Sequence, residues 1–262
     1  MQQLNVLIAG KKPTGFAEKI TGSKYLNKLY TTYDTETKEA IPINFNTFKE
    51  LAEKCKTLKI DIVIAEEEKW ILQGIGDVLR ANHINCIAPT SKWTKLGISE
   101  TMRRNLLEKY EIPMPETVLL PTEFPVIVRA DGVSMEAESL TDIIKIKKAI
   151  FNTSAEIAQT IHIEKMLNGE KHTIISLYDG KNLVTFSESE IDKNLLNDYN
   201  QKLQNLLNGE KANFTGFINS DITVFENTVY NNGFNFRFIE PETQTDILYI
   251  LISALYQKLN EI

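Results

Sequence analysis

Two continuous apolar segments near the start of the chain limit most strongly what it can fold into. They are Leu4–Ala9 (LNVLIA) and Ile60–Ala65 (IDIVIA), and an amphipathic helix pattern from Thr47 to Thr57 precedes the second. A strand that is apolar on successive residues is typical of a parallel sheet that is buried on both faces. Strands that alternate with helices imply right-handed crossover connections. We therefore predict a small Rossmann-like domain over residues 1–98, with a helix from Trp70 to Asn82 among its elements.

A second pattern lies near the end of the chain, where residues 229–245 read VYNNGFNFRFIEPETQT. It predicts a short alternating strand with Phe234, Phe236 and Phe238 on one side and Asn235, Arg237 and Ile239 on the other. Such a strand buries its aromatic residues and presents an amide and a guanidinium together. The same pattern also occurs on the wet face of antiparallel strands that carry no site, so both interpretations stay open here.

Composition excludes several functional classes. The chain has 262 residues, of which 42% are apolar and 24% charged, and its formal net charge is -6. Its basic residues are spread along the sequence, so we expect no nucleic-acid partner. Cys55 and Cys86 have no metal or redox spacing and are interpreted as apolar filler in a reducing compartment. The sequence shows neither a signal peptide nor an apolar run of about 18 residues. We therefore expect a cytoplasmic protein without a membrane partner.

The pattern in residues 229–245 resembles the end of the ATP-grasp domain in the phosphoribosylamine-glycine ligase (glycinamide ribonucleotide synthetase) family. That family has a Glu-x-Asn metal-ligand pair, an Arg two positions on, and an Asp-Pro-Glu-Thr-Gln run. Asn235, Arg237 and residues 241–244 match, while Gly233 stands in the place of the metal-binding Glu. The resemblance runs along nearly the whole chain. It implies an α/β plus α+β fold, with an ATP-grasp domain over residues 99–262 and without the family's C-terminal domain.

Arg129 is the cation of the apolar strand Phe124–Ala130 (FPVIVRA). A basic residue in an apolar strand is costly unless an anion or a hydrogen-bond acceptor meets it. Pairing with a carboxylate of the protein would satisfy it. The resemblance implies the other interpretation, because the family has a Lys here that holds ATP phosphate. After Gly132 the family has a glycine-rich loop over the phosphates, and this chain reads VSMEAES instead.

The segment Ile161–Leu167 resembles the family's adenine hinge. By that resemblance Glu164 binds ribose, and the residues expected to line the nucleotide with it are Lys165, Met166, Leu167 and Glu170. His162 and His172 have no metal-ligand spacing and are interpreted as structural or exposed.

Further site residues also come from the resemblance. Glu68 falls at the family's Gly-Pro-Glu and is expected, with Pro241 and Glu242, to contact substrate. Arg237 is the candidate catalytic residue on an anionic substrate, and Asn235 the candidate metal ligand. Three adjacent carboxylates such as Glu66, Glu67 and Glu68 usually form no more than a solvated loop, so that interpretation stays open as well.

Two functions follow from these residues. The first is an ATP-dependent carbon–nitrogen ligase of purine biosynthesis that works through an acyl phosphate, uses ATP and Mg²⁺, and has an impaired or altered activity. Two departures from the family motivate the expectation of an impaired or altered activity. Gly233 replaces the metal carboxylate, and Glu100 replaces a Lys that contacts phosphate. The second is a non-catalytic paralogue that acts as a nucleotide-binding or protein-interaction module. The expected partners are a nucleotide and a small-molecule substrate. The strongly apolar final helix, predicted over Thr243–Leu259, belongs to the core, and any surplus apolar surface would be a subunit contact in a homo-oligomer.

Overall fold

The first part of the chain folds around a five-stranded parallel sheet. The computed structural model describes residues 3–12, 15–186, 191–241 and 243–261. The strand order in this sheet is β3-β2-β1-β4-β5. Its members are β1 (Leu4–Ala9), β2 (Leu26–Thr31), β3 (Ala40–Pro42), β4 (Ile62–Ala65) and β5 (Cys86–Ile87). The two continuous apolar segments thus form neighbouring central strands, β1 and β4, and the predicted α/β character is confirmed.

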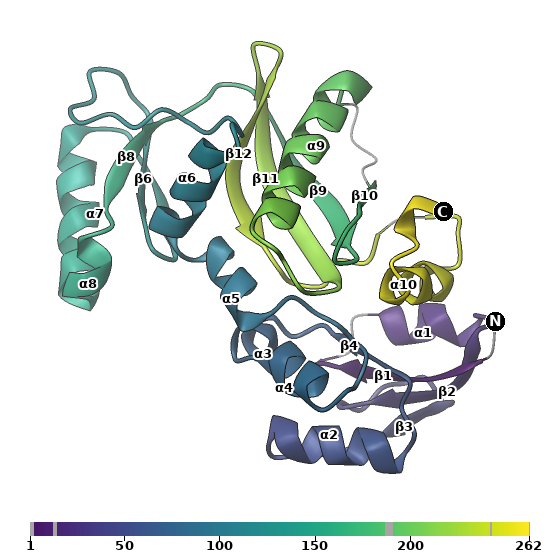
Figure 1. Cartoon of the computed structure of the whole chain (residues 1–262). Coiled ribbons are helices and arrows are strands. Elements are labelled where there is room, and N and C mark those ends of the chain that lie inside the picture. Colours follow the sequence, from purple (N-terminus) through teal and green to yellow (C-terminus); the bar gives the residue numbers. More distant parts are fainter. Residues whose placement is uncertain (1–2, 13–14, 187–190, 242, 262) are drawn as a thin grey trace.

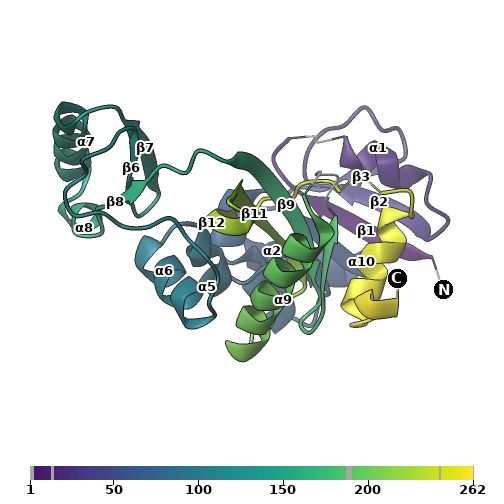
Figure 2. The ribbon, with the colours of Figure 1, turned by 90° about the horizontal axis from the view of Figure 1, so that it is seen from above.

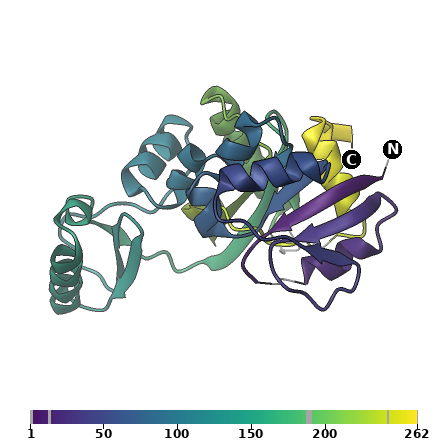
Figure 3. The same ribbon diagram turned by 90° about the horizontal axis from the view of Figure 1, so that it is seen from below.

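Helices cover both faces of this sheet. Helix α1 (Phe16–Thr21) packs on the face that carries Val6 and Ile8, while helix α2 (Phe48–Thr57) lies on the opposite face (Figure 3). The side chain of Thr47 caps α2, because its Oγ1 accepts a hydrogen bond from the N–H of Glu50 at 3.2 Å.

The predicted helix Trp70–Asn82 was wrong as a single element. The chain instead forms α3 (Glu68–Leu72) and α4 (Ile75–Ala81). Gly74 separates them with a φ of 88°, a left-handed conformation that glycine adopts readily.

A helical segment leads out of this sheet towards a second one. It consists of α5 (Ser91–Thr94), the 3₁₀ turn Lys95–Gly97 and α6 (Glu100–Lys109). Gly97 lies against β12, where a Cβ atom would come within 2.7 Å of the carbonyl oxygen of Phe234. The absence of a side chain at Gly97 therefore lets this segment pack closely on the second sheet.

The second sheet is antiparallel, with the order β10-β9-β11-β12. Its strands are β9 (Glu170–Tyr178), β10 (Leu183–Phe186), β11 (Gly216–Phe225) and β12 (Thr228–Asn235), and α9 (Lys193–Gly209) packs on it. Phe234 and Phe236 are buried in this core as predicted, and Phe238 packs against Phe16 and Phe217. The alternating strand is shorter than predicted, because β12 ends at Asn235 and Arg237 lies in the bend that follows.

A third, smaller sheet forms a separate lobe. It contains β6 (Val126–Ala130), β7 (Val133–Ala137) and β8 (His162–Lys165) in the order β7-β6-β8. Helices α7 (Leu140–Thr153) and α8 (Ala155–Ala158) pack on one face of it. Figures 1 and 2 show this lobe standing apart from the rest of the molecule. The VSMEAES segment, which replaces the family's glycine-rich loop, therefore lies mainly in a regular strand of this lobe.

The last helix returns to the first sheet. Helix α10 spans Ile247–Leu255, so the predicted start at Thr243 and end at Leu259 were both wrong. Its buried residues share one core with Val6, Ile8 and Phe16, and α10 lies beside α1 in Figure 1. Packing against the first sheet and α1 thus buries most of the apolar surface of α10. Within the part of the chain that the structure describes, no helix is long and apolar enough to cross a membrane.

Candidate functional site

The strands of the small lobe and of the second sheet meet at a cavity of about 400 Å³, which we call the cleft. Five of the six residues predicted to bind nucleotide line it together: Arg129 from β6, and Glu164, Lys165, Met166 and Leu167 from the segment that starts in β8. Residues that the sequence did not single out complete the wall, and they include Lys171, Thr173, Asp221 and Asn232. The cleft has the size of an ordinary small-molecule site.

Glu164 is the centre of a buried ion-pair network inside this cleft. Its side chain is fully buried, and Arg129 Nε donates a hydrogen bond to its Oε2 at 2.5 Å. Its other oxygen, Oε1, accepts from Arg104 at 2.6 Å and from Arg103 at 3.4 Å, and lies 3.2 Å from His162 Nε2. The carboxylate that resemblance assigns to ribose is therefore saturated by partners within the protein.

The network joins two parts of the fold. Arg129 and Glu164 belong to the small lobe, whereas Glu100, Arg103 and Arg104 belong to α6. Glu100 Oε2 accepts from Arg103 at 2.6 Å, and the backbone N–H of Glu100 donates to Asp131 Oδ1 at 2.9 Å. Three guanidinium groups therefore face the carboxylates of Glu100 and Glu164 in this network.

The same contacts set the protonation of Glu164. Burial alone raises the pKa of this carboxyl group, but the hydrogen bond from His162 and the charges of Arg129 and Arg103 outweigh that effect. The pKa is lowered to about 2, so the group is ionised at neutral pH. Glu164 is thus a permanent counter-ion for the arginines around it.

The position that the resemblance assigns to a metal-binding carboxylate, Gly233, faces open space. A Cβ atom built on Gly233 would meet no atom within 4 Å. On the neighbouring strand β11, Asp221 pairs directly with Gly233, and its Oδ1 accepts a hydrogen bond from Thr173 at 2.8 Å. Asn235, the candidate metal ligand, accepts at Oδ1 from Asn219 Nδ2 at 2.8 Å.

One group of side chains in the described part of the chain has the spacing of a metal site: Glu100, His162 and Glu164. Arg103, Arg104 and Arg129 all contact its carboxylates. Three adjacent cations repel a divalent ion, so this group does not fit one.

The other predicted site residues lie outside the cleft. The side chain of Glu170 is 82% exposed at the start of β9. Glu68 is exposed at the start of α3, at the carboxyl end of the first sheet. Arg237 is exposed, and Pro241 is buried in the segment before α10. Glu242 lies outside the described residues.

Sequence patterns did not assign Arg103 or Arg104 to a site, and His162 was interpreted as structural or exposed. Spacing along the chain does not show which elements meet, so it could not bring these residues together. One signal was present: a Glu at residue 100, beside two arginines one turn further on, is an acidic and basic set on one helix face.

Comparisons with known proteins identify relatives in sequence and in fold. No family model matches the chain. A phosphoribosylamine–glycine ligase from Caldanaerobacter subterraneus is 24% identical over 98% of this chain and 76% of its own length. The crystal structure of a phosphoribosylamine–glycine ligase from Thermotoga maritima superposes with a TM-score of 0.73, at 15% identity, over 98% of this chain and 76% of that one. Biotin carboxylase from Campylobacter jejuni, solved as an ATP complex, gives a TM-score of 0.70 at 13% identity, over 95% and 70%. The chain has the ATP-grasp fold and is similar in sequence to phosphoribosylamine–glycine ligases.

Proposed function

We propose that this protein binds an adenine nucleotide in the cleft and is a divergent relative of ATP-dependent carbon–nitrogen ligases whose phosphoryl chemistry is impaired or altered. The cleft supports nucleotide binding, because the chain segment Lys165–Leu167 lines it and its volume suits such a ligand. A solved structural neighbour, biotin carboxylase, carries ATP. The similarity to phosphoribosylamine–glycine ligases supports descent from a purine-biosynthetic ligase.

One observation carries the claim of impaired chemistry: Glu164 neutralises the cation that would hold phosphate. Phosphoryl transfer depends on cations that stabilise the developing charge, and removing one such group typically costs about 3 kcal/mol of the barrier. Arg129 is already paired with Glu164 at 2.5 Å, and Glu100, at the position where the family has a Lys, lines a second cavity that Arg129 also lines. A polyphosphate would have to compete with two internal carboxylates for these arginines.

We also infer that nucleotide binding here does not depend on Mg²⁺ in the way that the family uses it. A magnesium ion is held mostly by carboxylate and other oxygen ligands. Gly233 offers none, the Oδ1 atom of Asn235 accepts from Asn219, and the cluster of Glu100, His162 and Glu164 is surrounded by arginines. Asp221, across from Gly233, is the carboxylate placed nearest to the lost ligand position in the strand register.

A second candidate function is a non-catalytic module that binds nucleotide or a protein. The observation that favours it is the same saturated network, since a site built to transfer phosphate keeps its cations accessible. Under this alternative the network holds the small lobe against α6, and the cleft serves binding alone.

A cytoplasmic location of the protein remains a prediction.

The experiment that separates these functions is calorimetric titration with ATP, with and without Mg²⁺, followed by an assay of ADP release in the presence of phosphoribosylamine and glycine. Binding with slow or absent ADP release supports the proposal. Binding that strongly requires Mg²⁺ and supports turnover at ordinary enzyme rates contradicts impaired chemistry. No heat at millimolar ATP removes nucleotide from the function altogether and leaves the interaction module.

A further inference from the structure

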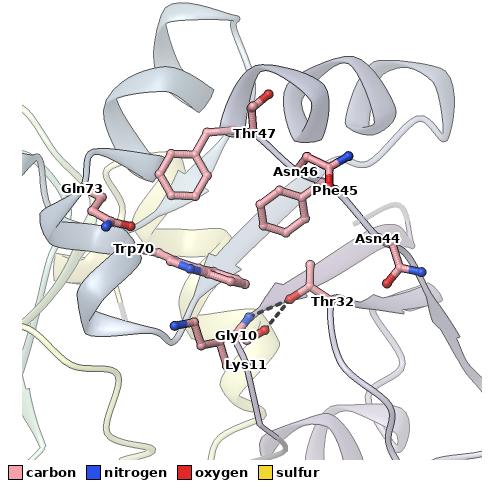
Figure 4. Close-up of a pocket in the computed structure, with 10 residues that line it drawn as sticks. Gly10, Lys11, Thr32, Asn44, Phe45, Asn46, Thr47, Trp70 and Gln73 are labelled. Carbon is pink, nitrogen blue, oxygen red and sulfur yellow. Dashed lines mark hydrogen bonds between the residues drawn. The ribbon is translucent and has the colours of Figure 1, made fainter.

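We propose that the first sheet carries a second ligand site, for a flat heteroaromatic ring bearing one anionic group. The site is a cavity of about 560 Å³ at the carboxyl edge of the parallel sheet. Its walls come from the residues that follow β1 and β2, from the segment between β3 and α2, and from α3 (Figure 4). Open α/β sheets bind their ligands at this edge.

Three aromatic side chains form the apolar wall of this cavity. Phe45, Phe48 and Trp70 are half-buried, and all three line the cavity. The ring centroids of Phe45 and Trp70 are 5.2 Å apart in an edge-on arrangement, and that of Phe48 lies 6.3 Å from Trp70. Each ring packs partly on the core below and leaves part of its surface facing the cavity. Aromatic surface gathered around an open cavity favours a planar ring as ligand.

Carboxamide groups supply the polar wall. Asn44 and Gln73 are exposed at the cavity, and neither side chain hydrogen-bonds to another described residue. A carboxamide both donates and accepts, so it matches the mixed donors and acceptors along the edge of a heterocycle. The rim is also held in place, because the N–H of Gly10 donates to Thr32 Oγ1 at 2.9 Å, and that hydroxyl donates to the carbonyl of Gly10 at 2.6 Å.

The charge of the side chains that line the cavity favours an anionic ligand. Lys11 is the one charged side chain among the described residues that line it, and it makes no ion pair with a described residue. The protein as a whole carries a net charge of -6. An unpaired lysine in a cavity without a lining carboxylate, on an acidic protein, creates a local positive potential. One cation suits one phosphate or carboxylate group.

The cavity is separate from the cleft. None of its lining residues belongs to the small lobe or to the second sheet, and the two sites share no residue. The inference therefore does not depend on the proposed nucleotide site, and each can fail alone.

Trp70 makes the test direct. We would titrate the full chain with adenosine 5′-monophosphate and follow tryptophan fluorescence. The protein has two tryptophans, and Trp93 is buried in the second core, so a saturable change reports on Trp70. The response should vanish in Trp70→Phe.

Lys11→Gln and Lys12→Gln are a matched pair, because both lysines are exposed neighbours and Lys11 alone lines the cavity. Lys11→Gln should weaken binding of the monophosphate about tenfold, as expected for one lost charge-assisted contact. It should leave binding of uncharged adenosine unchanged, and Lys12→Gln should change neither. The absence of a saturable response to adenosine, inosine and uridine monophosphates at millimolar concentration overturns the proposal. Equal effects of the two lysine variants overturn it as well.

Discussion

Arg129 and Glu164 bind each other across two neighbouring strands, with 2.5 Å between Nε and Oε2. Glu164 lies opposite Ile127 in the register of β6 and β8, so Arg129 is its diagonal neighbour on the same face. Resemblance assigns these two residues to phosphate and ribose, two separate parts of one nucleotide. Their mutual contact is an internal ion pair at the two positions that the resemblance assigns to a nucleotide.

The network should make stability depend on acid. The pKa of Glu164 is about 2 in the folded protein, below its usual value of 4.5. Its contribution is therefore complete above about pH 4.5 and is lost as the pH falls towards 2. We expect Glu164→Gln to lower the free energy of unfolding by about 3 kcal/mol at pH 7. The difference from the natural protein should shrink on going to pH 3, as measured by denaturant unfolding.

Glu170→Gln is the control for that measurement. Its side chain is 82% exposed on the same stretch of chain, so the variant should match the natural protein within about 0.5 kcal/mol at every pH. The difference in the free energy of unfolding between the natural protein and Glu164→Gln could instead stay constant from pH 7 to 3. That result would show that the ion pairs do not set the pKa of Glu164.

Gly233→Glu should restore a metal-dependent site. The backbone at Gly233 has no positive φ, and a Cβ atom there meets open space. A new carboxylate beside Asp221 and Asn235 supplies the oxygen donors that Mg²⁺ prefers. We expect Mg²⁺ to tighten ATP binding to this variant about tenfold, an effect of about 1.4 kcal/mol, and to change little in the natural protein.

Gly233→Gln separates charge from size in the same calorimetric titrations. It has nearly the same volume as Glu and no charge, so Mg²⁺ should not tighten ATP binding to it. An equal Mg²⁺ effect in both variants, or in neither, would contradict a role for this position in metal binding.

The break between α3 and α4 requires glycine. Gly74 has a φ of 88°, which costs an L-residue about 1–2 kcal/mol. Gly74→Ala should lower the free energy of unfolding by that amount. Gly22→Ala is the matched control, because Gly22 has a φ of -77° and open space around it. A similar loss in both variants would argue against backbone conformation as the cause.

The C-terminal helix should be part of the same cooperative unit as the first sheet. Leu251 is fully buried among residues of α1 and β1. Leu251→Ala should destabilise the protein by about 2–5 kcal/mol, whereas Phe151→Ala, at a side chain that is 64% exposed on α7, should cost less than about 0.5 kcal/mol. Thermal unfolding followed by circular dichroism measures both, and a Leu251→Ala protein as stable as Phe151→Ala would contradict the shared core.

Sequence patterns predicted the sheets better than the site. Leu4–Ala9 and Ile60–Ala65 identify central parallel strands because burial on both faces leaves a continuous apolar signature. The break at Gly74 was missed, since a single glycine within a helical pattern is usually tolerated. The late start of α10 was missed because Asp246, whose side chain caps it, stands among other polar residues.

The ion-pair network could not be predicted from the sequence, for a different reason. Arg129 left two open interpretations, phosphate or a protein carboxylate, and the structure pairs it with Glu164. That choice depends on how α6 docks against the small lobe, which brings Arg103 within reach of a strand 61 residues later. Periodicity describes the faces of single elements and carries no information about such a meeting.

The return of α10 to the first sheet has a consequence for synthesis on the ribosome. The strands of the sheet are made well before residues 247–255, which cover part of the face that carries Val6 and Ile8. During translation this part of the apolar face therefore stays exposed until α10 has been made, while the small lobe and the second sheet emerge. A nascent chain in that state exposes hydrophobic surface, which is the feature that chaperones bind and that drives aggregation.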